Sequence, residues 1–345
     1  MIPVVLLTGF LGSGKTTLLQ RLLKDPSMAG AAVLINEFGE VGLDHQLLDR
    51  IDDNVVLLKS GCICCTVRGE VADALSNLDS LRSRGEIAFD RVVIETTGLA
   101  DPYPVLQTLT AHPVLRSHFT NGGVLTTVDA VNAQLQVEHR AEAVRQIAAA
   151  DRIVLTKTDL ADAGEDQALR ARLARINPAA TILTTQEPVE TILSGFEPAA
   201  FAAALVTDDA HHCGPDCDHE GHHHHHAHSH GTHGHHDEDL GVTSFSLVIE
   251  DEIDWTMFGT WLTLLLHKHG DRIFRVKGIL ALEGEDKPIA IHGVQHLVHA
   301  PTHMTHWPNG PRRSRIVFIL EGISPDQIRR SFAAFTGCSA VRAAA

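Results

Sequence analysis

Short apolar runs alternate with stretches of helical character along the chain as far as residue 193. Continuous runs of Val, Ile and Leu are typical of strands that are buried on both faces. The predicted strands are Val4–Thr8, Ala32–Asn36, Arg91–Glu95, Gly123–Val128, Arg152–Thr156 and Thr181–Thr184. The predicted helices are Lys15–Lys24, Val71–Arg82, Pro102–Thr110, Glu138–Ala149 and Asp166–Ile176. This alternation predicts an α/β fold with a doubly wound, mainly parallel sheet.

The pattern changes at Asp208, where apolar residues almost disappear and histidine dominates as far as Asp239. A segment of this kind cannot offset the entropy of ordering by burial, so it is expected to be a flexible linker. A second pattern of strands and helices follows. Its predicted strands are Ser244–Ile249, Ile273–Leu282, Ile289–His296 and Arg315–Leu320, and its predicted helices are Ile253–His267 and Ser324–Phe335.

These patterns divide the chain of 345 residues into three parts, which is consistent with a length above that of one ordinary domain. We expect an α/β domain at 1–205, a histidine-rich linker at 206–241 and a smaller α+β domain at 242–345. The mixed pattern after the linker, with Ser324 followed by Pro325 and Asp326 as a helix start, favours the last assignment.

The overall charge excludes some classes of partner. A formal net charge of −15 gives no basic surface for neutralising phosphates, so neither nucleic acid nor an anionic membrane is expected as a main partner. The chain opens on a short apolar run that ends in a glycine loop, which fits neither a signal peptide nor a membrane span. We therefore expect a cytoplasmic protein. The sequence leaves the oligomeric state open, a homodimer included.

The segment from Gly9 to Thr16 matches the phosphate-binding pattern GxxxxGK[ST] and lies between a predicted strand and a predicted helix. In such a loop the backbone N–H groups and the helix N-terminus face one anion. Lys15 is expected to reach the β- and γ-phosphates, and the Thr16 hydroxyl to ligate Mg²⁺. The expected nucleotide contacts in this loop are Gly9, Gly12, Ser13, Gly14, Lys15, Thr16 and Thr17. A simple glycine turn is the alternative.

Two further strand ends carry residues that suit the same site. Glu95, in Glu95-Thr96-Thr97-Gly98, brings a carboxylate to the sheet edge where Mg²⁺ and the γ-phosphate are expected. Thr156-Lys157-Thr158-Asp159 matches the guanine-binding pattern [NT]KxD. A carboxylate accepts hydrogen bonds from N1–H and the amine of guanine, whereas adenine has an acceptor at N1 and no such amine. The sequence thus predicts GTP and GDP as ligands, with a solvated loop charge as the alternative for Asp159.

Three of the six cysteines, Cys62, Cys64 and Cys65, fall within four positions after Gly61. They are too close together for a set of disulfides, and in a reducing compartment they stay thiols. Thiolates prefer Zn²⁺, Co²⁺ or Cu⁺ to Mg²⁺, and three ligands leave one tetrahedral position open. The pattern favours a transfer site for a soft metal; buried small residues or a redox pair are the alternatives.

Together these segments resemble the CobW family of metal-linked GTPases, relatives of the nickel-handling proteins UreG and HypB. The resemblance rests on GFLGSGKTTLL, INEFGEVGLD, GCICC, ETTG, TKTD, the histidine-rich linker and the RVKG…HGVQH region. It implies a slow intrinsic GTPase, a zinc or cobalt ion held at the CxCC motif near the nucleotide, and delivery to a client metalloprotein or metal-cofactor pathway.

The resemblance also extends to single positions. It implies that Glu37 belongs to a segment that senses the γ-phosphate, where it orients water or contacts metal. The sequence departs from the commonest family form at Thr156, where the guanine motif often has Asn. It also begins at Met1 almost on the first strand, without the extension by which some relatives engage methionine aminopeptidase, so that client is not expected.

The histidine tract is predicted to collect metal ions, because neutral imidazoles at high density bind Zn²⁺, Ni²⁺ or Co²⁺. Its densest part is His222, His223, His224, His225 and His226. A solvated spacer is the alternative. For the whole protein the alternative functions are a metal buffer with incidental GTPase activity and a small-molecule kinase on the same fold. Spacing alone does not decide whether the histidines of the second domain, among them His292 and His299, bind metal.

Overall fold

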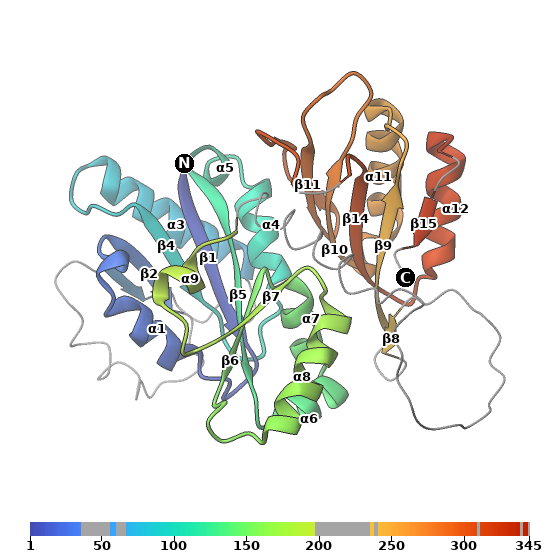
Figure 1. Ribbon diagram of the computed structural model, residues 1–345. Helices are drawn as coiled ribbons and strands as arrows, with labels where there is room; N and C mark the ends of the chain where they lie inside the picture. The colour runs from blue at the N-terminus through green and yellow to red at the C-terminus, as the bar shows by residue number, and fades with distance from the viewer. Residues whose placement is uncertain are drawn as a thin grey trace.

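The computed structural model describes residues 1–35, 56–59, 67–196, 235–237, 241–308, 311–338 and 341–343. Figure 1 shows two domains, each built on its own sheet. Within the described ranges no helix is long and apolar enough to cross a membrane.

A parallel sheet of seven strands forms the centre of the first domain (Figure 1). The strands follow the order β3-β2-β4-β1-β5-β6-β7, and every neighbouring pair is parallel. They are β1 (Ile2–Gly9), β2 (Ala31–Ile35), β3 (Val56–Lys59), β4 (Arg91–Glu95), β5 (Phe119–Asp129), β6 (Arg152–Thr156) and β7 (Thr181–Thr184). The predicted α/β fold with a parallel sheet is confirmed.

Helices cover both faces of this sheet. They are α1 (Lys15–Leu23), α3 (Val67–Ser83), α4 (Tyr103–Ala111), α5 (Leu115–His118), α6 (Ala133–His139), α7 (Ala141–Ala149), α8 (Ala163–Ile176) and α9 (Val189–Leu193), with a 3₁₀ turn at Pro26–Met28. In β1, Val4 and Leu6 join one apolar cluster, while Val5 and Leu7 join another. Successive side chains of a strand point to opposite faces, so this alternation fills a core on each side of the sheet.

The second domain is an antiparallel sheet with two helices. Its strands are β8 (His235–Asp237), β9 (Val242–Ile249), β10 (Ile273–Leu280), β11 (Ile289–Val294), β12 (Leu297–Val298), β13 (Thr302–His303), β14 (Ser314–Glu321) and β15 (Val341–Ala343). Its helices are α11 (Trp255–His269) and α12 (Pro325–Thr336), with a 3₁₀ turn at Gly270–Arg272. The main strand order is β12-β11-β10-β14-β9-β15, with β13 beside β11 and β8 beside β9. The predicted α+β character of this region is confirmed.

Polar side chains cap both helices of the second domain, as predicted for Ser324. The side chain of Asp254 accepts a hydrogen bond from Met257 N at 2.7 Å at the start of α11. Ser324 and Gln327 form a capping box at the start of α12. These side chains satisfy N–H groups that lack partners within the helix, which fixes where each helix begins.

The sheet of the second domain is covered on both faces. Helices α11 and α12 pack on one face through the cluster that contains Phe258, Trp261 and Phe332. The other face meets the first domain, where the rings of Tyr103 and Phe274 stack with centroids 5.8 Å apart. Both faces of the second sheet are therefore buried, and the first domain provides part of its core.

The observed elements differ from the predicted ones at several places. Strand β3 was not predicted, and the single helix predicted over Glu138–Ala149 is two helices separated at Arg140, whose backbone is extended. Strand β8 lies inside the segment predicted as a linker and pairs with β9, with His235 opposite Ser244.

Candidate functional site

The segment between β1 and α1 forms a tight loop at the carboxyl end of the parallel sheet. Gly9, Gly12 and Gly14 have φ angles of 145°, 72° and 84°, a region that side chains other than glycine rarely adopt. A Cβ atom on Gly9 would lie 2.3 Å from Oγ1 of Thr127, so the neighbouring strand leaves no room for one. At Gly12 the corresponding space is open. The loop backbone is thus packed on β5 but accessible at its tip.

Lys15 turns its ammonium group back into this loop. Its Nζ donates hydrogen bonds to Gly9 O at 2.9 Å and to Phe10 O at 3.2 Å. Burial lowers the pKa of Lys15, and the nearby carboxylate of Glu95 opposes that shift. The ammonium group is buried and its partners are neutral carbonyl oxygens, so an anion bound in the loop would stabilise its charge.

Thr16 and Glu95 meet at the same sheet edge. The Thr16 hydroxyl donates to Glu95 Oε1 at 2.8 Å, which joins the first turn of α1 to the end of β4. Gly98, three residues after Glu95, packs against the phosphate loop, because a Cβ atom there would lie 2.7 Å from Leu11 N. Sequence reasoning placed Thr16 and Glu95 in one site, and the structure brings them together.

Thr156 and Lys157 hold the phosphate loop from the other side. The Thr156 hydroxyl donates to Ser13 O at 2.9 Å, and Lys157 Nζ donates to Gly12 O at 2.9 Å. Lys157 has a φ angle of 55°, an unusual value for a residue with a side chain. The TKTD segment therefore supports the loop that was predicted to bind phosphate.

Asp129 is a functional candidate that the sequence reasoning missed. It ends β5, is buried, and accepts from Lys157 Nζ at 2.7 Å. Burial raises the pKa of Asp129, but hydrogen bonds from Lys157 and Asn132 outweigh that effect and leave the pKa below its usual value. The signal that singled out Glu95, an acid at the end of a buried strand, was also present at Asp129.

The other predicted site residues divide into two groups. Thr17 and Asp159 are exposed at the sheet edge that carries the loop, in α1 and just after β6. Outside the described residues lie Glu37, Cys62, Cys64 and Cys65, and the histidines His222, His223, His224, His225 and His226. Within the described ranges, no three His, Cys, Asp or Glu side chains are grouped so that they could hold a metal ion.

The geometry suits a nucleotide with a hard divalent cation. Hydroxyl and carboxylate oxygens are the ligands that Mg²⁺ prefers, and Thr16 and Glu95 place one of each side by side. The loop supplies backbone N–H groups, the start of α1 and the Lys15 ammonium, the set that binds polyphosphates. The residues present therefore fit both groups.

Comparisons with known proteins agree with this description. The profile described as "CobW/HypB/UreG, nucleotide-binding domain" matches residues 3–184, and that described as "Cobalamin synthesis protein cobW C-terminal domain" matches residues 242–336. The zinc chaperone YjiA of Escherichia coli is 36% identical over 332 residues, which cover 96% of this chain and 98% of that protein. The zinc chaperone CobW of a Sinorhizobium species is 30% identical over 321 residues, with 85% of each chain covered.

The same relationship is seen among solved structures. The crystal structure of the Zn(II)-bound YjiA GTPase from E. coli matches with a TM-score of 0.70 and 33% identity, over 97% of this chain and 98% of that one. Because one profile matches more than half of the chain and a relative above 30% identity spans nearly all of it, the chain belongs to the CobW/HypB/UreG family.

Proposed function

We propose that this protein is a GTP-hydrolysing metallochaperone, which takes a transition-metal ion at its CxCC motif and delivers it to a client protein or cofactor pathway. The hydrogen bond from Thr16 to Glu95 beside the phosphate loop is the observation that carries the nucleotide half of this proposal. The cargo half rests on Cys62, Cys64 and Cys65 and on relatives that are named zinc chaperones.

In this proposal the site residues have distinct roles in GTP hydrolysis. Lys15 binds and neutralises the phosphates, and the backbone N–H groups of the loop orient them. Thr16 and Glu95 would hold Mg²⁺, which supplies charge stabilisation of the transferring phosphoryl group when bound. Lys157 and Thr156 keep the loop in shape. Asp159 reads the guanine base, and Glu37 orients the attacking water or contacts the metal.

Topology supports an arrangement with metal and nucleotide as neighbours. The cysteine motif comes between β3, which ends at Lys59, and α3, which begins at Val67. Strand β3 is parallel to β2, and β2 is parallel to β4, so all three end at the edge where Glu95 and the phosphate loop lie. Loops at this edge of a parallel sheet form its ligand site. The metal cargo, zinc or cobalt, is then held next to the γ-phosphate.

The proposal is tested by the coupling between the two ligands. If GTP closes a cage around the metal, then zinc or cobalt binds more tightly with GTP than with GDP, and the metal strengthens GTP binding by the same factor. A coupling of about 1–3 kcal/mol corresponds to roughly 5–150-fold, measurable by competition with a chromophoric chelator. Cys64→Ala should remove the coupling and leave basal GTP binding. Cys338→Ala, at a buried free cysteine of the second domain, is the matched control.

The test separates a chaperone from a metal buffer. Deletion of residues 208–234, which leaves β8 in place, should lower the number of metal ions bound and leave the coupling intact, because the tract is not expected to distinguish the two nucleotide states. Equal metal affinity with GTP and with GDP, in protein shown to be fully loaded with nucleotide, would contradict the chaperone mechanism.

A further inference from the structure

A cavity of about 650 Å³ lies between the two domains, at the edge of the parallel sheet opposite to the phosphate loop. The first domain lines it with the amino-terminal parts of β1 and β5, such as Pro3 and Asn121, and with Phe196. The second domain contributes Lys277, His292 and His299. None of these residues takes part in the nucleotide site, so the cavity is a separate feature.

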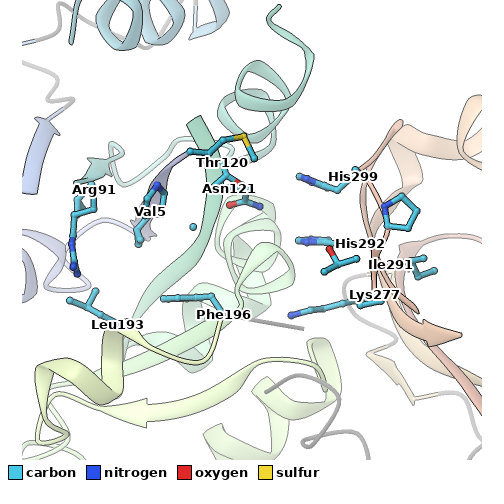
Figure 2. A pocket seen from close by; sticks show the side chains of 18 of the residues that line it. Val5, Arg91, Thr120, Asn121, Leu193, Phe196, Lys277, Ile291, His292 and His299 are labelled. Atoms are coloured by element: carbon cyan, nitrogen blue, oxygen red, sulfur yellow. The ribbon is translucent and has the colours of Figure 1, made fainter. Parts of the chain in front are cut away.

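Polar side chains of the second sheet point across this cavity toward the first domain. Figure 2 shows Lys277, His292 and His299 extending from β10, β11 and the end of β12 toward Asn121 and Phe196. Lys277 and His292 are register partners on β10 and β11. The rings of His292 and His299 stack with centroids 4.7 Å apart, and His299 N donates to His292 O at 2.8 Å. The two imidazoles and the ammonium group thus form one surface.

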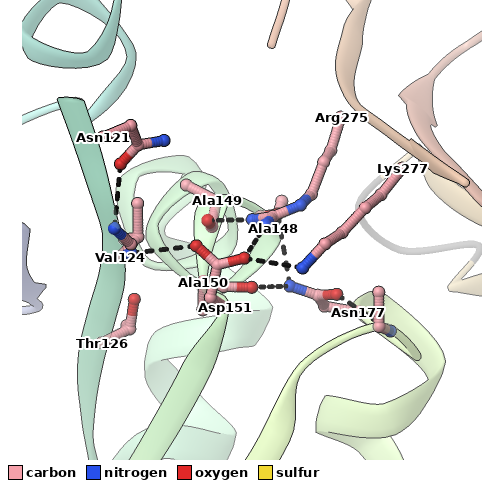
Figure 3. Close-up of polar contacts among 12 residues, drawn as sticks. Asn121, Val124, Thr126, Ala148, Ala149, Ala150, Asp151, Asn177, Arg275 and Lys277 are labelled. Carbon is pink, nitrogen blue, oxygen red and sulfur yellow. Dashed lines mark hydrogen bonds and ion pairs between the residues drawn. The ribbon is translucent and has the colours of Figure 1, made fainter. Parts of the chain in front are cut away.

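Three cations lie in or beside this surface. Arg275 and Lys277 share the carboxylate of Asp151, with Lys277 Nζ 3.0 Å from Asp151 Oδ1 (Figure 3). Asp151 also accepts from Val124 N at 3.0 Å through its other oxygen. A third cation, Arg152, lies with its guanidinium 5.6 Å from the centre of the Phe196 ring. Burial lowers the pKa of Lys277, and Arg275 and Arg152 act in the same direction, whereas Asp151 opposes the shift.

The same surroundings disfavour a metal ion at the histidine pair. A divalent cation would lie beside Arg275 and Lys277, and no third His, Cys, Asp or Glu is grouped with the two histidines in the described part of the chain. Burial, and after it the field of Arg275, lowers the pKa of His292 well below 6.5 and lowers that of His299. Both rings are therefore neutral near pH 7, and each can donate one N–H.

Hydrogen-bonding groups at the cavity wall match an acceptor-rich ligand. His292 Nε2 is buried and has no hydrogen-bond partner among the described residues. The carbonyl of the Asn121 side chain accepts from Gly123 N at 3.0 Å, which leaves its amide as a donor group. Ile291 and Phe196 add apolar wall area. Several donors, nearby cationic side chains and an apolar side are the features that bind an organic anion.

We propose that this cavity binds a small organic anion, a molecule with a carboxylate or phosphate group held by Lys277, His292, His299 and Asn121. The volume exceeds that of an inorganic ion and lies in the range of small-molecule sites. Because its contacts come from both domains, the anion joins them and stabilises their docking. It is neither the nucleotide nor the metal cargo.

The test uses the full chain with GDP and Mg²⁺ in excess, so that the phosphate loop is filled. Succinate and glycerol 3-phosphate are titrated by calorimetry, and the melting temperature is followed in parallel. Succinamide and glycerol are the uncharged counterparts. We expect at least one of the two anions to bind and to raise the melting temperature, and the neutral compounds to do neither. The anion that binds more tightly identifies the chemical class as carboxylate or phosphate.

Substitutions of the cavity histidines test whether the anion binds in this cavity. His292→Leu and His299→Leu each remove one donor and should weaken anion binding by about tenfold. His303→Leu, an exposed histidine of the neighbouring strand β13, is the matched control and should leave the affinity unchanged. His299 is less buried than a core residue, so its variant carries the test if His292→Leu does not fold.

Three results would overturn the proposal. The first is no binding of either anion at millimolar concentration. The second is the same anion affinity in His299→Leu as in the unchanged protein. The third is a loss of one bound zinc ion per chain in His299→Leu, but not in His303→Leu, during a zinc titration, since that result would make the histidine pair a metal site.

Discussion

The hydroxyl of Thr16 donates to the carboxylate of Glu95 across two elements that are 79 residues apart in the sequence. Thr16 lies in the first turn of α1 and Glu95 ends β4, which is the neighbour of β1 in the sheet. The parallel order of the strands, and not any local signal, brings the two oxygens together. Each of them is thereby oriented before a metal or nucleotide binds.

Substitutions of Lys15, Thr16 and Glu95 are predicted to lower GTP turnover. Lys15→Ala, Thr16→Ala and Glu95→Gln should each lower GTP turnover by about 10²-fold or more, since each removes charge stabilisation or a Mg²⁺ ligand. Far-ultraviolet circular dichroism should remain that of the folded protein. Glu86→Gln, at an exposed ion pair with Arg84, is the control and should turn over normally. If any of the three variants hydrolysed GTP at the wild-type rate with normal Mg²⁺ dependence, the changed residue would not belong to the active site.

Base selectivity is predicted to depend on Asp159. Asp159→Asn should weaken GTP binding by roughly 1–3 kcal/mol and favour xanthosine triphosphate, because the new amide can donate to the C2 carbonyl of xanthine. Asp162→Asn changes an exposed carboxylate three residues further on, which makes no cap hydrogen bond to α8. Competition of the two triphosphates against a fluorescent analogue measures the preference. Unchanged GTP affinity in Asp159→Asn would show that this residue does not contact the base.

Gly98 has no room for a side chain, because a Cβ atom added there would lie 2.7 Å from the backbone of Leu11. Gly98→Ala should push the phosphate loop out of place, so GTP affinity should fall although no catalytic side chain is altered. Gly164→Ala is the matched control. A Cβ there meets nothing within 4 Å, and alanine in α8 should raise stability by about 0.5–1 kcal/mol. If both variants bind GTP equally well, the packing of Gly98 does not hold the loop.

The sequence predicted the central elements best. Strands β4, β6 and β7 begin and end where they were predicted. Strands β4 and β6 are almost wholly buried, so their continuous apolar runs are easy to recognise in the sequence. Strand β5 starts earlier than predicted, at Phe119, because its first part, Phe119–Gly122, contains polar residues and glycine and lacks a continuous apolar run. Strand β3 has only four residues, and an apolar run of that length does not distinguish a strand from a helical turn.

Other features depend on contacts that no local pattern records. Nothing in the residues around Arg140 marks the break between α6 and α7, since neither glycine nor proline is present. The ion pair of Lys157 with Asp129 follows from the adjacency of β5 and β6. The cavity between the domains depends on how the second sheet docks on the first. Its residues, from Met1 to Thr302, come together only in the folded chain.

Asp151 joins the two domains by accepting hydrogen bonds from Arg275 and Lys277. Asp151→Asn leaves two buried cations without this carboxylate and should lower the free energy of unfolding by about 3–5 kcal/mol. Asp90→Asn, which removes an exposed ion pair with Arg91, is the control and should have little effect. Denaturant unfolding of the two variants at pH 7 measures the difference.

The pairing of Asp151 with Arg275 and Lys277 also makes the free energy of unfolding depend on pH. Burial raises the pKa of Asp151, but Arg275 and Lys277 outweigh that effect and hold it far below its usual range. Because the folded pKa lies below the unfolded value of about 3.9, the stabilisation is complete above that value and is lost as the pH falls below it. The stability difference between the unchanged protein and Asp151→Asn should therefore be constant from about pH 5 to 7 and shrink under more acidic conditions. A difference that instead grew as the pH fell below 4 would show that the carboxylate is not held ionised by its two partners.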